Sequence, residues 1–230
     1  MAEIDVDGQI QELVEFYKSE RDRVISVSLS QIEAPLKGSA RLSELIHSSK
    51  SRLKDPDHLR DKLRRRNAKL AKEGRAFDIT QENLLTSITD LAGIRLLHLY
   101  TKQLPDIDAA LREVFTENRY DLAEQQFARI WDNDLAEQFR EWGFEVQHSE
   151  NYTSVHYVIN TASKTVVTCE IQVRTLSEEL WGEVDHAINY PHQSPRLACR
   201  EQLRALARVT SSATRLVDSI MMTHEEHPIT

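Results

Sequence analysis

Four segments of this 230-residue sequence carry polar side chains at alternate positions, the spacing that places residues on one face of a β-strand. In chain order, these polar rows are Lys50, Arg52 and Lys54; Asp90 beside Arg95; Tyr152, Ser154 and His156; and Glu170, Gln172 and Arg174. If the rows share one face of one sheet, they bring together two carboxylates, several cations and an exposed aromatic ring. Two carboxylates can bind Mg²⁺ together with substrate phosphates, and Arg and Lys neutralise charge on a transferring group. Because the aromatic ring can also stack on a base, the rows indicate phosphate chemistry.

The segment 166–190 is the best defined of the four because its hydrophobic period changes once along it. Over 167–174 apolar and polar residues alternate, which predicts a strand with one buried face. Thr175 and Glu178 then have the spacing of a capping box, which predicts the start of a helix. The side of this helix expected to be buried carries Leu180, Val184, Ala187 and Ile188. A strand that leads directly into a helix would hold its polar row on rigid elements.

The other elements follow from periodicity and from turn residues. In the first half of the chain, the expected elements are a helix over 8–33 ended by Pro35 and Gly38, a short helix over 42–46, an edge strand over 47–54 and a basic helix that starts at Asp55-Pro56-Asp57. They are followed by a strand over 94–100, a helix over 104–115, a helical connection over 120–142 and a strand over 152–160. The last expected element is a C-terminal helix whose buried side carries Leu203, Leu206 and Ala207. Trp181 is expected in the core, His186 as a structural hydrogen-bonding residue, and Cys169 as an inert buried thiol.

The charge of the chain is unevenly distributed. The net charge is −8, but the segment 50–75 holds eleven Lys and Arg against four Asp and Glu. This concentration on an acidic protein favours a local phosphate site over a broad nucleic-acid surface, although a solvated basic helix would give the same pattern. The two cysteines make neither a disulfide framework nor a metal-ligand spacing, and the acidic N-terminus lacks the pattern of a signal peptide. No apolar run is long enough for a membrane span, so we expect a cytoplasmic protein without a membrane partner.

Four short motifs, in this order, resemble those of the RelA/SpoT synthetase family. They are Arg52-x-Lys54 with Lys62; Asp90-Leu91-Ala92-Gly93-Ile94-Arg95; Tyr152-Thr153-Ser154-Val155-His156; and Glu170-Ile171-Gln172-Val173-Arg174-Thr175 followed by Trp181, Glu183, His186 and Tyr190. Members of this family are alarmone synthetases, which transfer pyrophosphate from ATP to a nucleotide 3′-hydroxyl. The resemblance implies an α/β (α+β) fold similar to nucleotidyltransferases, with a mixed sheet of about five strands flanked by helices. The implied substrates are ATP and a guanine nucleotide, GTP or GDP, with (p)ppGpp as the product.

The resemblance also implies roles on the ATP side of the site. Arg52, Lys54 and Lys62 would hold the ATP phosphates, and Arg95 would contact the donor nucleotide. Asp90 would bind Mg²⁺. The alternative for Asp90 and Arg95 is an Asp in an N-terminal turn and an Arg on an edge strand, and this segment alone favours that alternative.

On the acceptor side, the resemblance implies that Tyr152 stacks on the base and that His156 lies near the acceptor phosphates. Gln172 and Arg174 would support this side of the site. Glu170 would be the second acidic residue and would bind metal or take the proton from the attacking hydroxyl. A carboxylate between apolar neighbours is costly to bury unpaired, so the alternatives for Glu170 are solvent or a cation partner.

The acceptor loop departs from the family pattern. The family usually has Asn-Gly before the tyrosine, a Lys four residues before it and often an Arg after it. Here these places hold Glu150 and Asn151, His148, and Thr153. An acidic residue in a loop that is usually basic leaves two other acceptors open, namely an adenine nucleotide and the 3′ end of a tRNA, as in toxic relatives. A nucleotide-binding regulator without catalysis is a further alternative, although both acidic residues are retained.

The family's hydrolase half needs a His and His-Asp cluster upstream, and nothing before His47 supplies one. We therefore expect a small member with the synthetase part alone. The expected organisation is an N-terminal helical extension over 1–46, a synthetase domain over 47–190 and a C-terminal helical extension over 191–230. Flanking helices of such members often form oligomer contacts, so a homo-oligomer is compatible with this organisation.

Overall fold

One mixed β-sheet is the framework of the computed structural model, which describes residues 5–190 and 193–226. Within the described residues it has seven strands in the order β1-β2-β7-β6-β4-β5, with β3 paired to β6. Their bounds are β1 Ser48–Leu53, β2 Ala92–His98, β3 Asp121–Leu122, β4 Phe127–Ile130, β5 Glu145–His148, β6 Ser154–Asn160 and β7 Thr168–Thr175. The predicted α/β class with a mixed sheet is confirmed, and the sheet is larger than the expected five strands.

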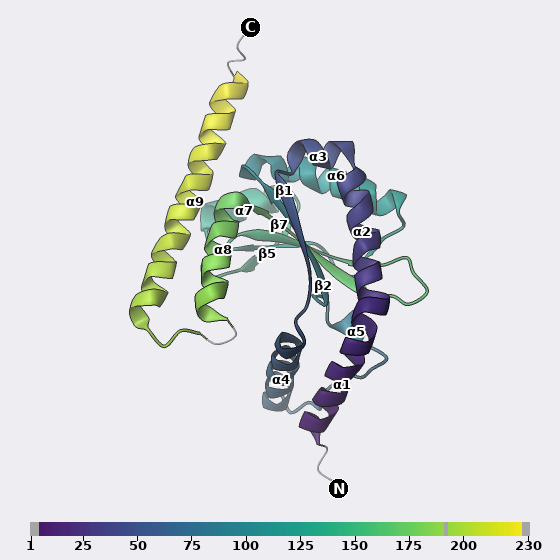
Figure 1. The fold of residues 1–230 in the computed structure, drawn as a ribbon. Coiled ribbons are helices and arrows are strands. Elements are labelled where there is room, and N and C mark those ends of the chain that lie inside the picture. Colours follow the sequence, from purple (N-terminus) through teal and green to yellow (C-terminus); the bar gives the residue numbers. More distant parts are fainter. Residues whose placement is uncertain (1–4, 191–192, 227–230) are drawn as a thin grey trace.

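Helices lie on both sides of the sheet (Figure 1). Their bounds are α1 Val6–Glu20, the π-helical turn η1 Arg21–Ile25, α2 Ser26–Gly38, α3 Ala40–Leu45, α4 Pro56–Lys72, α5 Leu84–Ser87, the 3₁₀ turn η2 Thr101–Gln103, α6 Leu104–Glu117, α7 Asn133–Glu141, α8 Leu176–Asn189 and α9 Leu197–Glu226. Figure 1 shows α8 and α9 side by side, with α1 and α2 on the other side of the central strands. Among the described helices, none is both long and apolar enough to cross a membrane.

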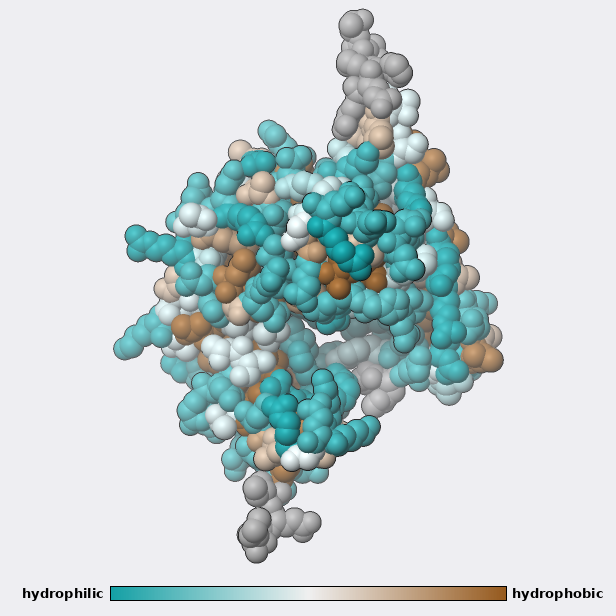
Figure 2. All heavy atoms as spheres, turned by 180° about the vertical axis from the view of Figure 1, so that it is seen from behind, coloured by the Kyte–Doolittle hydropathy of each residue, from teal (hydrophilic) through white to brown (hydrophobic). Residues whose placement is uncertain are grey.

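The hydrophobic core lies on the face of the sheet that is turned away from α8. Cys169, Ile171 and Val173 of β7 are buried there, as their alternation predicts, and they belong to one cluster with residues of α1, α2 and α6. Burial raises the pKa of the Cys169 thiol, which keeps it protonated and inert as expected. Seen from behind, the molecular surface is largely hydrophilic, with hydrophobic side chains in small separate areas (Figure 2).

The N-terminal helices also fix part of the polar face. Tyr17 of α1 is fully buried, and its hydroxyl donates a hydrogen bond to the backbone carbonyl of Lys54. Helix α4 begins directly afterwards, with Asp55 as N-cap accepting from the backbone N–H of Asp57 at 2.9 Å and Pro56 in the first turn. The end of β1 and the start of the basic helix are therefore held by local capping and by α1 together.

Two predictions on secondary structure were wrong. Helix α2 does not end before Pro35 but includes it and continues to Gly38. Proline has no backbone N–H to donate to the carbonyl four residues earlier, and here the Tyr120 hydroxyl donates to that carbonyl, of Gln31, at 2.9 Å. The connection 120–142 is not entirely helical, because it contains β3 and β4 before α7. These strands are short and pair only with segments distant in sequence, so no local period marks them.

Candidate active site

The register of four strands brings the predicted polar rows onto one face. Lys50 of β1 lies opposite Arg95 of β2, Arg95 opposite Gln172 of β7, and Gln172 opposite His156 of β6. Because directly opposite residues point to the same face of a sheet, these four side chains form one row across it. The neighbouring row places Glu170 two residues before Gln172 on the same strand face. The convergence expected from the sequence is therefore present.

Glu170 lies near the middle of this face, with only 17% of its side chain exposed. His156 Nδ1 is 2.9 Å from its Oε1, and Gln172 Nε2 donates to its Oε2 at 2.9 Å. Burial opposes ionisation, but the hydrogen bonds from His156 and Gln172 outweigh it, so the pKa of Glu170 lies below its ordinary value. Glu170 is thus a carboxylate at neutral pH with both oxygens oriented.

Asp90 lies in the turn before β2 and contacts two lysines. Lys54 Nζ is 2.7 Å from one carboxylate oxygen, and Lys62 Nζ is 2.8 Å from the other. Burial alone would raise the pKa of Asp90, but Lys62 and Lys54 lower it. Burial also lowers the pKa of Lys54, and the charge and hydrogen bond of Asp90 partly offset this effect. Three residues that the sequence predicted for phosphate and metal binding therefore meet, coming from the position directly after β1, from α4 and from the turn before β2.

The carboxylates of Asp90 and Glu170 suit Mg²⁺ only if substrate phosphates supply further ligands. Among the described residues, no group of three or more His, Cys, Asp or Glu could hold a metal ion. Asp90 and Glu170 are close enough for the charge of Asp90 to raise the pKa of Glu170. Mg²⁺ usually keeps several waters and uses one or two carboxylates plus substrate phosphates. The two carboxylates fit this pattern, and the lysines beside Asp90 would then turn to the phosphates.

Two adjoining cavities open onto this face. One, of about 220 Å³, is lined by Lys50, Arg52, Gly93, Arg95 and Glu170, among others. The second, of about 700 Å³, lies against α4; its cationic lining residues are Arg52, Lys54, Lys62, Arg65, Arg66, Lys69 and Arg95. Together the cavities have the size and charge to hold a nucleoside triphosphate. Arg65 and Lys69 were not singled out from the sequence, although their spacing from Lys62 places them on the same side of the helix.

Arg95 does not point toward Asp90. Its guanidinium donates to Glu179 at 3.1 Å and to Glu183 at 2.7 Å, and both carboxylates lie on α8. Glu179 is buried, with 7% of its side chain exposed, whereas Glu183 is 52% exposed. Glu179 could not be singled out from the sequence, because the alternation of apolar and polar residues ends at residue 174.

Helix α8 faces the sheet with a different side from the one predicted. Leu180 and Ile188 are 57% and 39% exposed, while Glu178, Glu179 and Trp181 are buried. The reason is electrostatic, because the face of the sheet below carries cations that need counter-charges. The capping box is half formed. Thr175 accepts from the backbone N–H of Glu178, whose side chain accepts instead from the backbone N–H of Thr153.

The residues predicted for the acceptor side line a separate cavity of about 550 Å³, whose lining includes Tyr152, Arg129, His148, Glu150 and Asp185. The Tyr152 hydroxyl accepts from Arg129 at 2.9 Å. Its ring stacks on Trp181, with centroids 5.7 Å apart and planes 15° from parallel. Arg129 was missed because β4 was not recognised. The cavity carries both charges and has few cations for acceptor phosphates.

Two residues expected on the acceptor side lie deeper than that cavity. His156 is 2% exposed, and its Nε2 is 2.7 Å from Ser154 Oγ while its ring stacks on Phe127. Arg174 is 9% exposed and donates to Gln172 at 2.8 Å. His156, Gln172 and Arg174 thus contact Glu170 directly or through one another.

Comparisons with known proteins agree with this architecture. A family model described as the region found in RelA/SpoT proteins matches residues 51–195. GTP pyrophosphokinase YjbM of Bacillus subtilis (strain 168) is 26% identical over 133 residues, which are 57% of this chain and 56% of that protein. The match therefore spans little more than half the length of this curated relative.

Solved structures give the same fold. Small alarmone synthetase 1 from Bacillus subtilis, bound to its product pppGpp, is 22% identical with a TM-score of 0.63, and the match covers 92% of this chain and 99% of that one. A GTP pyrophosphokinase family protein from Streptococcus pneumoniae is 18% identical with a TM-score of 0.61, and the match covers 94% of each chain. Since the family model covers more than half of the sequence and the fold agrees, this chain belongs to the RelA/SpoT family.

Proposed function

We propose that the protein is an ATP-dependent pyrophosphokinase that transfers the β,γ-pyrophosphoryl group of ATP to the 3′-hydroxyl of a guanine nucleotide, GTP or GDP. The observation that carries this proposal is the pair of oriented carboxylates, Asp90 and Glu170, at the boundary of a basic cavity. Family membership and the small alarmone synthetase that is solved with pppGpp support the choice of guanine nucleotide and of (p)ppGpp as the product.

The donor would bind in the two adjoining cavities, with Arg52, Lys54 and Lys62 on the phosphates and Arg95 against the nucleoside. Mg²⁺, held by Asp90 and Glu170, would supply charge neutralisation on the phosphates. Because Lys54 and Lys62 already contact Asp90, they are placed to exchange that carboxylate for phosphate oxygens when ATP enters.

The transfer itself forms one bond and breaks one. The acceptor 3′-oxygen attacks the β-phosphorus, and the bond from that phosphorus to the bridging oxygen of the α-phosphate breaks, so that AMP leaves with the electron pair. The hydroxyl proton passes to Glu170, whose lowered pKa keeps it ionised at neutral pH. Gln172 and His156 hold the two oxygens of Glu170 in place.

The base of the acceptor would stack on the ring of Tyr152, which lines this cavity. Glu150 and Asp185 line the same cavity, and carboxylates are suited to accept hydrogen bonds from the N–H groups of a purine. This lining also suits an adenine base or the terminal adenosine of a tRNA, so the assay must include those acceptors.

The test is transfer of label from ATP labelled in its β- and γ-phosphates, with Mg²⁺ present. GTP, GDP, GMP, ADP, ATP and deacylated tRNA would be offered separately. We expect labelled product with GTP or GDP, its loss in Glu170→Gln, and retained transfer in the exposed control Glu117→Gln. Transfer only to adenine nucleotides or to tRNA would replace the proposed acceptor. No transfer to any acceptor, despite ATP binding, would overturn the enzymatic proposal and favour a regulator.

A further inference from the structure

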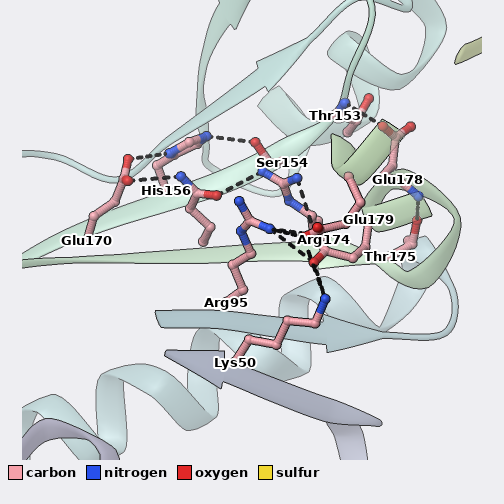
Figure 3. Close-up of polar contacts among 12 residues, drawn as sticks. Lys50, Arg95, Thr153, Ser154, His156, Glu170, Arg174, Thr175, Glu178 and Glu179 are labelled. Carbon is pink, nitrogen blue, oxygen red and sulfur yellow. Dashed lines mark hydrogen bonds and ion pairs between the residues drawn. The ribbon is translucent and has the colours of Figure 1, made fainter. Parts of the chain in front are cut away.

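A buried carboxylate on α8 joins three strands of the site. Glu179 accepts from Lys50 of β1 at 3.0 Å, from Arg95 of β2 at 3.1 Å and from Arg174 of β7 at 3.5 Å. Figure 3 shows the three cations converging on this side chain from the sheet below the helix. Ion pairs with one exposed partner contribute little to the stability of the fold, but a buried cation without its counter-charge destabilises it strongly. Of the three cations, Arg174 is the one that is itself buried.

The position of Arg174 is tightly constrained. A Cβ on Gly182 would lie only 2.7 Å from its NH1, so any other residue at position 182 would displace the end of the Arg174 side chain. Its Nε has no hydrogen-bond partner among the described residues. Burial and the charge of Arg95 both lower the pKa of Arg174. The ion pair with Glu179 is therefore the main compensation for holding this guanidinium under α8.

From Arg174 a chain of hydrogen bonds leads to Glu170. Arg174 NH2 donates to Gln172 Oε1 at 2.8 Å, which fixes the orientation of the amide. The amide nitrogen then faces Glu170 and donates to its Oε2 at 2.9 Å. Figure 3 shows His156 in contact with the other oxygen, Oε1. If the amide turned over, its oxygen would face the carboxylate and the two would repel each other.

We propose that Glu179 is a positioning residue of the transfer reaction: by holding Arg174 it orients Gln172 and so the carboxylate of Glu170. This role rests on the proposed function. Glu179 also contacts Lys50 and Arg95, but Glu183 contacts the same two cations at 3.6 and 2.7 Å and does not reach Arg174. The neighbouring carboxylate thus provides a matched comparison on the same helix.

The test compares Glu179→Gln with Glu183→Gln. In Glu179→Gln we expect kcat to fall by about 10- to 100-fold, with a smaller change in KM for ATP, because misplacement of a reacting group acts mainly on turnover. Glu183→Gln, whose carboxylate does not reach Arg174, should change KM for ATP more than kcat.

A double variant tests whether Glu179 acts on Glu170 through Gln172. If Glu179 acts through Gln172, adding Glu179→Gln to Gln172→Met should cost no further kcat, whereas independent effects would multiply. Multiplying effects, equal kcat losses in the two single Glu variants, or kcat within twofold of the wild type in Glu179→Gln would each overturn the proposal. Glu179→Asp, which keeps the charge, should recover part of the loss if the substitution has not unfolded the protein.

A readout without turnover separates this proposal from the proposed function. The ¹⁵N shifts of the His156 ring nitrogens should change in Glu179→Gln and stay as in the wild type in Glu183→Gln, because His156 hydrogen-bonds to Glu170. If the wild type transfers no label but these shifts change as expected, the proposed function fails and the link to Glu170 stands. If the wild type is active and the shifts of both variants match it, the role of Glu179 fails and the function stands.

Discussion

Glu178 should make the stability of this protein depend on pH near neutrality. Its side chain lies at the start of α8, is 5% exposed, and accepts from the backbone N–H of Thr153 at 3.1 Å. Burial raises its pKa from 4.5 to about 7, although the Thr153 N–H and the charge of Arg174 oppose this. It lines a small internal cavity that also contains His98.

The sign and size follow from linkage. The native state holds the Glu178 proton more tightly than the unfolded chain does, so this stabilisation is complete below pH 4.5 and is lost as pH rises through about 7. At 1.36 kcal/mol per pKa unit, the shift corresponds to about 3 kcal/mol. Glu178→Gln keeps an acceptor for the Thr153 N–H but cannot titrate. The free energy of unfolding of the variant should therefore rise relative to the wild type by about 3 kcal/mol between pH 4.5 and pH 8.

Urea unfolding of both proteins at intervals across this range measures the difference. His98, whose pKa burial lowers to about 4, titrates in both proteins, and so its contribution cancels. Glu117→Gln, an exposed carboxylate on α6, controls for the substitution itself. A wild-type minus variant difference that is the same at pH 5 and pH 8 would refute the reasoning.

Three further predictions concern the core and the proposed ATP side of the site. Leu63→Ala, at a fully buried position of α4, should lower the free energy of unfolding by about 2–5 kcal/mol in urea titrations; a loss under 1 kcal/mol would show that α4 is not packed as described. Tyr157→Phe removes the hydroxyl that donates to Asp108 at 2.8 Å and should cost about 1–2 kcal/mol by the same method, whereas unchanged stability would count against this bond. Asp90→Asn should lower the pKa of Lys54 further, because the charge of Asp90 raises it; NMR titration of ¹³C-methylated lysines measures this, and an unchanged Lys54 titration would contradict the ion pair.

Much of the active site could be predicted from the sequence because it depends on short-range rules. Alternation along a strand follows from the pleat, so Glu170, Gln172 and Arg174 had to share a face. The start of α4 at Asp55-Pro56 and of α8 at Thr175 follows from the backbone N–H groups that a helix leaves unpaired. The roles of individual residues in binding ATP and acceptor remain predictions.

Other features depended on partners distant in the chain. Helix α2 includes Pro35 because Tyr120 donates to the carbonyl that the proline leaves unpaired. Strand β4 forms because β6 and β5 pair with it on both sides. The strand places Arg129 beside Tyr152. No local period of the sequence contains this information.

The side that α8 turns to the sheet could not be predicted from the local sequence. Helical period identified the helix over 176–189, and hydrophobicity predicted that Leu180 and Ile188 would face inward. The sheet below it carries Lys50, Arg95 and Arg174, so the helix buries Glu179 instead. For β7 and for the starts of α4 and α8 the local sequence was sufficient, because backbone geometry sets the period of an element and the position of its cap. The face that α8 turns to the sheet was settled only by tertiary packing, since buried charges must be compensated by side chains that the chain brings from far away.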